Sequence, residues 1–247
     1  MSVEPTNFEE DVSTFSSIEP FWARVLLELE RFGVTSLMYG AIATKGELSF
    51  GTRTSSMIWK TNHDSAFFKR FGAEGRDDFI DNCLTFEHCL TKTTPFIWHD
   101  PSSWEKATSA QLEHAQTAIE LGLHVGFTLP TTYFANDRLG AISVAAGNHT
   151  PLSFNMMWES QRDNLFKILD ILDNQMREKY LAQVINLSPR EKEVLQWLAA
   201  GLRPKQVAEK MQIGYRTVDK YIISAKTKLK AKSRDQAIAK AMIFNVI

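Results

Sequence analysis

Apolar residues recur three and four positions apart along several stretches of the chain, and this spacing predicts amphipathic helices. The stretches cover about 20–33, 65–71, 108–121 and 154–180. Apolar runs typical of strands lie between them, at 34–42, 94–98, 124–130 and 139–146. Because helices and strands do not alternate regularly, residues 1–180 are expected to form an α+β domain, a central antiparallel sheet flanked by helices.

The last sixty or so residues carry dense signals for the start and end of helices. Ser188 is a good N-cap, Pro189 falls at the first helical position, and Glu191 completes a capping box with Ser188. Gly201 is expected to end this helix. A later helix is expected to begin after the N-cap Ser233.

Two helices are expected between these signals, joined by a tight turn at 212–214 (QIG) in which Gly214 lets the chain reverse. The first begins near Pro204, and the second runs from Tyr215 to Leu229. Two short helices joined by such a turn form the helix-turn-helix unit that places a recognition helix in the major groove. We therefore expect an all-α four-helix domain over 186–247, joined to the first domain by a linker at 181–185.

Charge is divided unevenly between the two predicted domains. Residues 186–247 hold 13 Lys and Arg against 5 Asp and Glu, a net charge of +8, whereas residues 1–185 have a net charge of −9. A compact basic domain on an acidic body is typical of a segment that contacts phosphate. Charge and helix pattern together predict binding to double-stranded DNA.

The exposed side of the third helix of this domain supplies the candidate DNA contacts. Its N-terminal half should read base edges, since Asp219 can accept from a cytosine amino group and Lys220 can donate to guanine. The long cations beyond it suit phosphate contact. The candidates are Arg216, Thr217, Asp219, Lys220, Ile223, Lys226, Lys228 and Lys230, with Lys232 and Arg234 as further phosphate contacts.

Composition narrows the class of protein. No stretch approaches 18 consecutive apolar residues, which predicts no membrane span, and the acidic, polar N-terminus is unlike a signal peptide. Cys83 and Cys89 lack a second pair at metal-ligand spacing, so we interpret them as structural thiols rather than as a disulfide or a metal site. We expect a cytoplasmic protein without a metal or cofactor.

The C-terminal domain resembles a known family. Its P-R-E start, the A-x-G that ends its first helix and the R-T-V that opens its third helix are similar to the DNA-binding domain of LuxR-type regulators, over roughly 186–245. In that family the residues matching Glu191, Leu195 and Gly201 serve packing more than base reading. Asp219 departs from the amide, basic or small residue usual at its position, so the resemblance implies an unusual DNA sequence.

The N-terminal domain resembles the same family more weakly. The segments 95–98 (PFIW), 122–130 (GLHVGFTLP) and 139–143 (LGAIS) are similar in order and spacing to the autoinducer-binding domain of quorum-sensing LuxR-type receptors. That domain encloses an acyl-homoserine lactone between sheet and helices, so the resemblance implies this small-molecule autoinducer as the effector. A sensory domain of the PAS or GAF kind would share the outline, but not the three segments together.

The resemblance also places ligand contacts on this sequence. The family's Trp-x-x-x-Tyr pair, its Asp-Pro, and its later Trp, Gly and hydroxyl residue fall on Phe67, Phe71, Asp81, Trp98, Gly126 and Ser143, with slightly longer gaps around Asp81. Asp81 can accept from the ligand's amide N–H, and Ser143 can donate to its carbonyl. Trp98 can stack on a flat or cyclic head group.

Phe67 removes a hydrogen-bond donor from this set. The family's first Trp donates to the lactone carbonyl, and leaving that carbonyl unpaired costs about 1–3 kcal/mol, or roughly ten- to a hundredfold in affinity. Trp59, His63 or a water molecule would have to replace the donor, and Phe71 makes the pocket more apolar. The ligand is therefore either an acyl-homoserine lactone held in a modified way or a different, more apolar small molecule. A ligand-independent regulator is the remaining alternative.

Two other classes of function fit the sequence less well. An enzyme might use Asp81 with His63 or His88, or Cys83 as a nucleophile, but the sequence has no nucleophile elbow, phosphate loop or metal-binding His pair. A phosphorylated receiver domain needs an acidic pair after its first strand, where this chain has Ala-Thr-Lys. We therefore predict a non-enzymatic, ligand-responsive transcriptional regulator, a homodimer because two-fold proteins read paired half-sites.

Overall fold

The computed structural model describes residues 6–43, 57–63, 82–131 and 139–247, and the chain divides into two compact units between Asn174 and Gln175. The predicted helix at 65–71 and the candidate residues Phe67, Phe71 and Asp81 lie outside the described residues. Among the helices that are described, none has the length and apolar character needed to cross a membrane.

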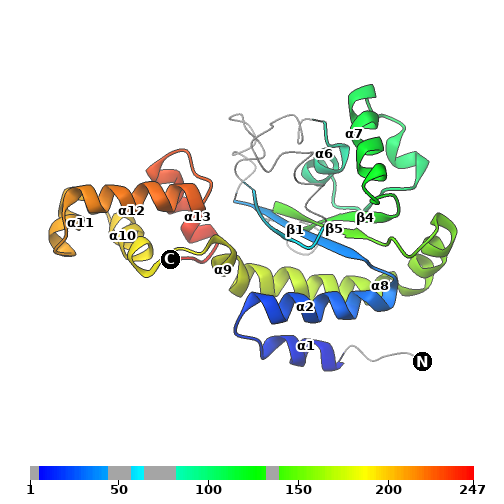
Figure 1. The fold of residues 1–247 in the computed structure, drawn as a ribbon, viewed down its shortest axis with the longest axis horizontal. Coiled ribbons are helices and arrows are strands. Elements are labelled where there is room, and N and C mark those ends of the chain that lie inside the picture. The colour runs from blue at the N-terminus through cyan, green and yellow to red at the C-terminus, as the bar shows by residue number, and fades with distance from the viewer. Residues whose placement is uncertain (1–5, 44–56, 64–81, 132–138) are drawn as a thin grey trace. The chain divides into compact units, whose positions relative to one another are not determined.

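A five-stranded antiparallel sheet forms the centre of the N-terminal unit, which confirms the predicted fold class (Figure 1). In chain order its strands are β1 (Ser36–Ile42), β2 (Ile58–Thr61), β3 (Phe96–Ile97), β4 (Gly126–Pro130) and β5 (Leu139–Ala145). Their order across the sheet is β2-β1-β5-β4-β3. The sequence did not predict β2, because four residues are too few to show a period.

Helices cover both faces of this sheet. One face carries α2 (Ile18–Leu29) and α8 (Pro151–Gln175), with α1 (Thr6–Ser13) packed on the outside of α2, and the other carries α6 (Leu84–Thr91) and α7 (Ser109–Glu120) (Figure 1). Short 3₁₀ helices, η1 (Glu30–Phe32) and η3 (Pro101–Trp104), follow α2 and β3. Since alternate residues of a strand point to opposite faces, each strand contributes to both layers.

The face toward α8 holds the main core of this unit. Phe127 of β4 packs against Phe154 and Trp158 of α8, with ring centroids 6.3 and 4.9 Å apart. Tyr39 of β1 is fully buried and donates its hydroxyl to the buried Asp173 Oδ1 of α8 at 2.8 Å. The opposite face is therefore the one available for a ligand.

The helix predicted over 154–180 begins earlier and continues differently. Thr150 and Ser153 exchange capping hydrogen bonds, and Pro151 takes the first helical position, so α8 begins three residues before the predicted start. After α8 the chain forms a π-helical turn, η5 (Met176–Tyr180), and a short helix, α9 (Leu181–Ile185). The residues of the predicted linker, 181–185, therefore form a helix. Leu181 and Ile185 bury their side chains, which holds this helix against the rest of the unit.

The C-terminal unit contains the four predicted helices. They are α10 (Pro189–Ala199), α11 (Pro204–Lys210), α12 (Tyr215–Lys228) and α13 (Arg234–Ile243). Ser188 and Glu191 form the predicted capping box, and Ser233 caps α13 by accepting from the Gln236 N–H. Gly201 adopts the left-handed conformation after α10, with φ 92°, as its place in the sequence predicted.

The turn between α11 and α12 corrects one expectation. Gln212, not Gly214, adopts the left-handed conformation, with φ 54°, whereas Gly214 is the extended N-cap of α12. The Ile213 N–H reaches the Ala208 carbonyl at 3.0 Å and the Gln212 N–H reaches the Glu209 carbonyl at 3.2 Å. These two bonds form a Schellman motif at the end of α11. The motif requires the left-handed conformation at position 212, whichever residue occupies it.

Candidate ligand cavity and DNA interface

A cavity of about 440 Å³ lies between the sheet and the helices α6 and α7. Its volume is in the range of small-molecule sites. The described residues that line it include no Asp, Glu, Lys or Arg. Because a buried charge on a ligand needs a partner, this lining suits an uncharged and largely apolar molecule.

Strand register orders the cavity face of the sheet into successive rows, because residues opposite each other in antiparallel strands point to the same side. Met38, Ser143 and Thr128 form the first row, across β1, β5 and β4. Gly40 and Ala141 form the second. We call Trp98, Thr128 and Ser143 the polar end of the cavity, which begins at the first row.

The polar end is a chain of three hydrogen-bonding side chains. Trp98 Nε1 donates to Thr128 Oγ1 at 2.9 Å, and Thr128 Oγ1 lies 3.1 Å from Ser143 Oγ. Either hydroxyl can donate in the second bond; when Thr128 donates to Ser143, the Ser143 proton is left for a group in the cavity. Thr128 was not among the predicted residues, although alternation along β4 from Gly126 places it on the same face.

Gly126 was predicted as a ligand contact, but it is not among the residues that line the cavity. A Cβ on this residue would lie 2.2 Å from the Val144 carbonyl oxygen and 2.8 Å from the Trp98 ring. The backbone N–H of Trp98 also donates to the Gly126 carbonyl at 3.0 Å. Gly126 therefore positions Trp98, and its contact with a ligand stays a prediction.

His63 and Trp59, the two proposed replacements for the missing donor, differ in position. His63 lines the cavity, with Nδ1 beside Ser36 Oγ, and burial lowers its pKa to about 4, so the ring is neutral at physiological pH. Trp59 stands opposite Gly40, on the cavity face of β2, but does not line the cavity. Burial also lowers the pKa of His114, which lines the wall formed by α7, to about 4.

The structure describes Cys83, His63 and His88 among the groups considered for catalysis, whereas Asp81 lies outside the described residues. Cys83 and Cys89 are free thiols that line the cavity, and burial raises the pKa of both, which suppresses the nucleophilic thiolate. His88 Nε2 is engaged with the Thr94 carbonyl at 2.6 Å. Within the described part of the chain, no group of three or more His, Cys, Asp or Glu could hold a metal ion.

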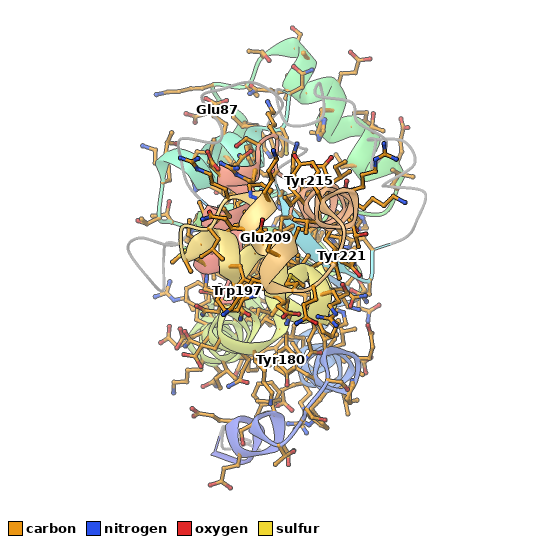
Figure 2. All side chains as sticks on the ribbon, turned by 90° about the vertical axis from the view of Figure 1, so that its left-hand side faces the viewer. Glu87, Tyr180, Trp197, Glu209, Tyr215 and Tyr221 are labelled. Atoms are coloured by element: carbon orange, nitrogen blue, oxygen red, sulfur yellow. The ribbon has the colours of Figure 1, made fainter. Side chains whose placement is uncertain are left out.

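The outer side of α12 carries the predicted base-reading residues. Arg216, Asp219, Lys220 and Ile223 are all exposed, and Ile223 has 58% of its surface accessible. Thr217 and Lys226 are half-buried. Figure 2 shows the side chains of this unit, with Tyr215 marking the start of α12 and Tyr221 its middle. The apolar residues Val218, Ile222 and Ala225 face the core of the unit, so α12 is held by one side and free on the other.

Lys228, a candidate DNA contact in the sequence, forms an ion pair within the C-terminal unit. Its Nζ donates to the buried Glu191 Oε2 at 2.8 Å, and Ser224 Oγ donates to Glu191 Oε1 at 2.6 Å. Burial alone would raise the pKa of Glu191, but the hydrogen bonds from Lys228, Ser224 and the Ser188 N–H lower it to about 2. Glu191 therefore ties α12 to the start of α10.

Lys240 also supports the C-terminal end of α12. It is 1% exposed, and its Nζ donates to the Lys230 carbonyl at 3.2 Å, just beyond the end of the helix. A cation at this position also complements the negative end of the helix dipole. The predicted phosphate contacts Lys230, Lys232 and Arg234 are exposed. No local sequence signal marks Lys240, because lysine is rarely buried.

Two family models match the chain. The autoinducer binding domain matches residues 17–169, and the domain of bacterial regulatory proteins of the luxR family matches residues 185–241. The first contains the sheet and the cavity, and the second contains the helix-turn-helix. The N-terminal match identifies this domain as an autoinducer-binding domain, and not as a receiver domain or a sensory domain of the PAS or GAF kind.

The chain is also similar to individual proteins. The quorum sensing-dependent transcriptional regulator RpaR of Rhodopseudomonas palustris is 31% identical over 163 residues, which cover 65% of this chain and 64% of RpaR, slightly less than two-thirds of its length. The transcriptional activator protein AnoR of Acinetobacter nosocomialis is 24% identical over 218 residues, 85% of each chain. The crystal structure of Escherichia coli SdiA covers 99% of both chains with a TM-score of 0.51 at 18% identity, which supports the fold. With the autoinducer-binding model over more than half of its length and the luxR-family model over its C-terminal domain, the chain belongs to the LuxR-type quorum-sensing transcriptional regulators, which bind DNA and an autoinducer.

Proposed function

We propose that this regulator binds an acyl-homoserine lactone in the cavity, and that occupancy raises the affinity of a cytoplasmic homodimer for paired DNA half-sites. The observation that carries the proposal is the chain of side chains Trp98, Thr128 and Ser143: with Thr128 donating to Ser143 Oγ, the Ser143 proton can be donated to a ligand carbonyl. Acyl-homoserine lactones are uncharged and join a polar head to an apolar chain. That division matches the polar end and the apolar remainder of the cavity.

Ligand acts here by filling space. An empty cavity of about 440 Å³ between the sheet and α6 and α7 leaves apolar side chains without packing partners. A ligand that binds only the arrangement in which the sheet, α6 and α7 enclose the cavity stabilises that arrangement by mass action. If this arrangement is the DNA-competent one, the ligand shifts the population toward it.

The DNA interface is the exposed side of α12. Arg216, Asp219 and Lys220 would read base edges in the major groove, with Ile223 as an apolar contact to a thymine methyl group. Lys226 and Lys230 would contact phosphate, whereas Lys228 supports α12 through Glu191. Replacing Lys230 with Ala should weaken binding to every DNA sequence, and replacing Lys220 with Ala should change the preferred sequence.

Native mass spectrometry of the protein expressed with and without candidate lactones tests the ligand and the oligomeric state together. Ser143→Ala should reduce lactone affinity by about ten- to a hundredfold, since the ligand carbonyl loses its donor. Ser160→Ala, on the exposed surface of α8, is the matched control and should leave affinity unchanged. Capture of a lipid in place of any lactone would favour the more apolar ligand, and unchanged DNA affinity with every ligand would indicate a ligand-independent regulator.

A further inference from the structure

A methionine lies over a glycine on the cavity face of the sheet. A Cβ built on Gly40 would be 2.9 Å from Met57 Sδ and 3.6 Å from Met57 Cγ. Both residues line the cavity. The thioether of Met57 therefore occupies the space that a side chain at position 40 would need.

Register shows where this contact lies relative to the polar end. Ser143 pairs with Met38, Gly40 is two residues farther along β1, and Ile42 two residues farther again. Each step of two residues advances about 7 Å along the strand. A ligand whose carbonyl meets Ser143 and whose chain runs along β1 passes over Gly40 before it reaches Ile42.

The sheet residues around this contact are small, so the Met57 side chain and not the sheet takes up the space here. Gly40, Gly140 and Ala141 all line the cavity, and a Cβ on Gly140 would meet the Gly40 carbonyl oxygen at 2.2 Å. Beyond them, Met57, Phe86 and Leu90 pack against the buried Ile42. We call these four residues the apolar end.

Met57 is the adaptable member of the apolar end. Methionine is unbranched, with several rotatable bonds, so it fills irregular space and can move aside at small cost. Ile42, by contrast, is 3% exposed and part of the sheet, and Phe86 and Leu90 belong to α6. The three heavy atoms nearest to a Cβ at Gly40 in the second row all belong to Met57.

We propose that Met57 sets the length of the acyl chain that this regulator accepts, which rests on the proposed function. With its thioether over Gly40, Met57 takes up space at the second row, between Ser143 and the residues Ile42, Phe86 and Leu90, which also line the cavity. Shortening Met57 widens the cavity at this row and gives a longer chain more room toward Ile42, Phe86 and Leu90. Position 57 is thus a specificity-determining residue for the ligand, acting on the tail and not on the head.

A series of unsubstituted acyl-homoserine lactones that differ by two carbons tests this, with dissociation constants measured by titration calorimetry on the full-length protein. Met57→Ala should move the best-bound length to a longer chain. Each newly buried methylene contributes about fourfold in affinity, so the preference for the next longer lactone should change by about 15-fold. Met57→Val, which removes less of the side chain, should give an intermediate shift and serves if the alanine variant does not fold.

Met38→Ala is the matched control, because Met38 lines the same cavity on the same strand but pairs with Ser143 at the polar end. It should weaken all lactones by a similar factor and leave the best-bound length unchanged. If the unaltered protein binds no lactone, the proposed function fails. If it binds lactones but Met57→Ala and Met57→Val keep the original length preference, or Met38→Ala shifts it instead, the inference about Met57 is overturned while the proposed function stands.

Discussion

The two units of this regulator differ in the sequence distance over which their key contacts form. In the C-terminal unit, each capped helix start depends on residues within four positions, such as Ser188 with Glu191. In the N-terminal unit, the polar end joins Trp98 to Thr128 and Thr128 to Ser143, and Tyr39 bonds Asp173 from 134 positions away. A surface built from local signals can be read from spacing, whereas a cavity depends on strand register that no short segment contains.

Two glycines give the sharpest test of this contrast. Gly126→Ala should lower the free energy of unfolding by about 3 kcal/mol or more, because the new Cβ would meet the Val144 carbonyl oxygen at 2.2 Å and the Trp98 ring at 2.8 Å. Gly201→Ala should cost only about 1–2 kcal/mol, since nothing lies within 4 Å and only the left-handed backbone disfavours alanine. Urea denaturation of the full-length variants measures both.

Lactone binding distinguishes the two substitutions further. Gly126→Ala displaces Trp98 and should weaken the ligand, whereas Gly201→Ala should leave its affinity unchanged. Equal costs for the two substitutions would contradict the difference between non-local and local positions.

Glu191 is an exception to this division between local and distant contacts, because it caps its own helix and also has distant partners. Glu191→Ala removes the acceptor for Ser188, Ser224 and Lys228 and should destabilise the C-terminal unit by about 3 kcal/mol. DNA affinity should fall with it, since α12 loses its tie to α10. Glu193→Ala on the same helix is the control, as its pair with Arg190 is exposed on both sides and should contribute less than about 0.5 kcal/mol. Loss of stability without loss of DNA affinity would remove Glu191 as a positioning residue.

The same contrast explains what the sequence could predict. Ser188, Gly201 and Ser233 announce their helices because capping is local chemistry, and the antiparallel sheet follows from the order of apolar runs. Thr128 and Met57 were missed because their roles arise from neighbours on other strands. The resemblance to the family singled out Gly126 but not its packing against Trp98, since a motif records a position and not what the residue touches.

Acid should weaken the ligand-binding unit through its buried histidines. Burial lowers the pKa of His63 from 6.5 to about 4, so the unfolded chain takes up the proton first. The stability that comes from the neutral ring is complete above pH 6.5 and is lost as the pH falls toward 4, by about 2 kcal/mol between pH 7 and pH 5. His63→Gln should flatten this slope in thermal melts, whereas His124→Gln, at an exposed position, should not. If the dependence of stability on pH is unchanged in His63→Gln, other groups cause the acid sensitivity.

Gln212 offers the smallest effect and the finest test of local signals. Its backbone is left-handed, with φ 54°, because the Schellman closure of α11 falls there, while Gly214 two residues later is extended. Gln212→Gly removes the strain of a side chain in that conformation, which disfavours non-glycine residues by about 1–2 kcal/mol, but it also makes the unfolded chain more flexible. The net result should be a stabilisation of about 0.5 kcal/mol.

Gly214→Ala, at an ordinary extended N-cap with only Thr217 Oγ1 nearby at 3.7 Å, should instead be slightly destabilising, because alanine is a poorer N-cap than glycine. Opposite signs for the two substitutions in urea denaturation would show that the turn is encoded by where α11 closes; a loss of stability at position 212 would show that Gln212 contributes contacts that outweigh its strain.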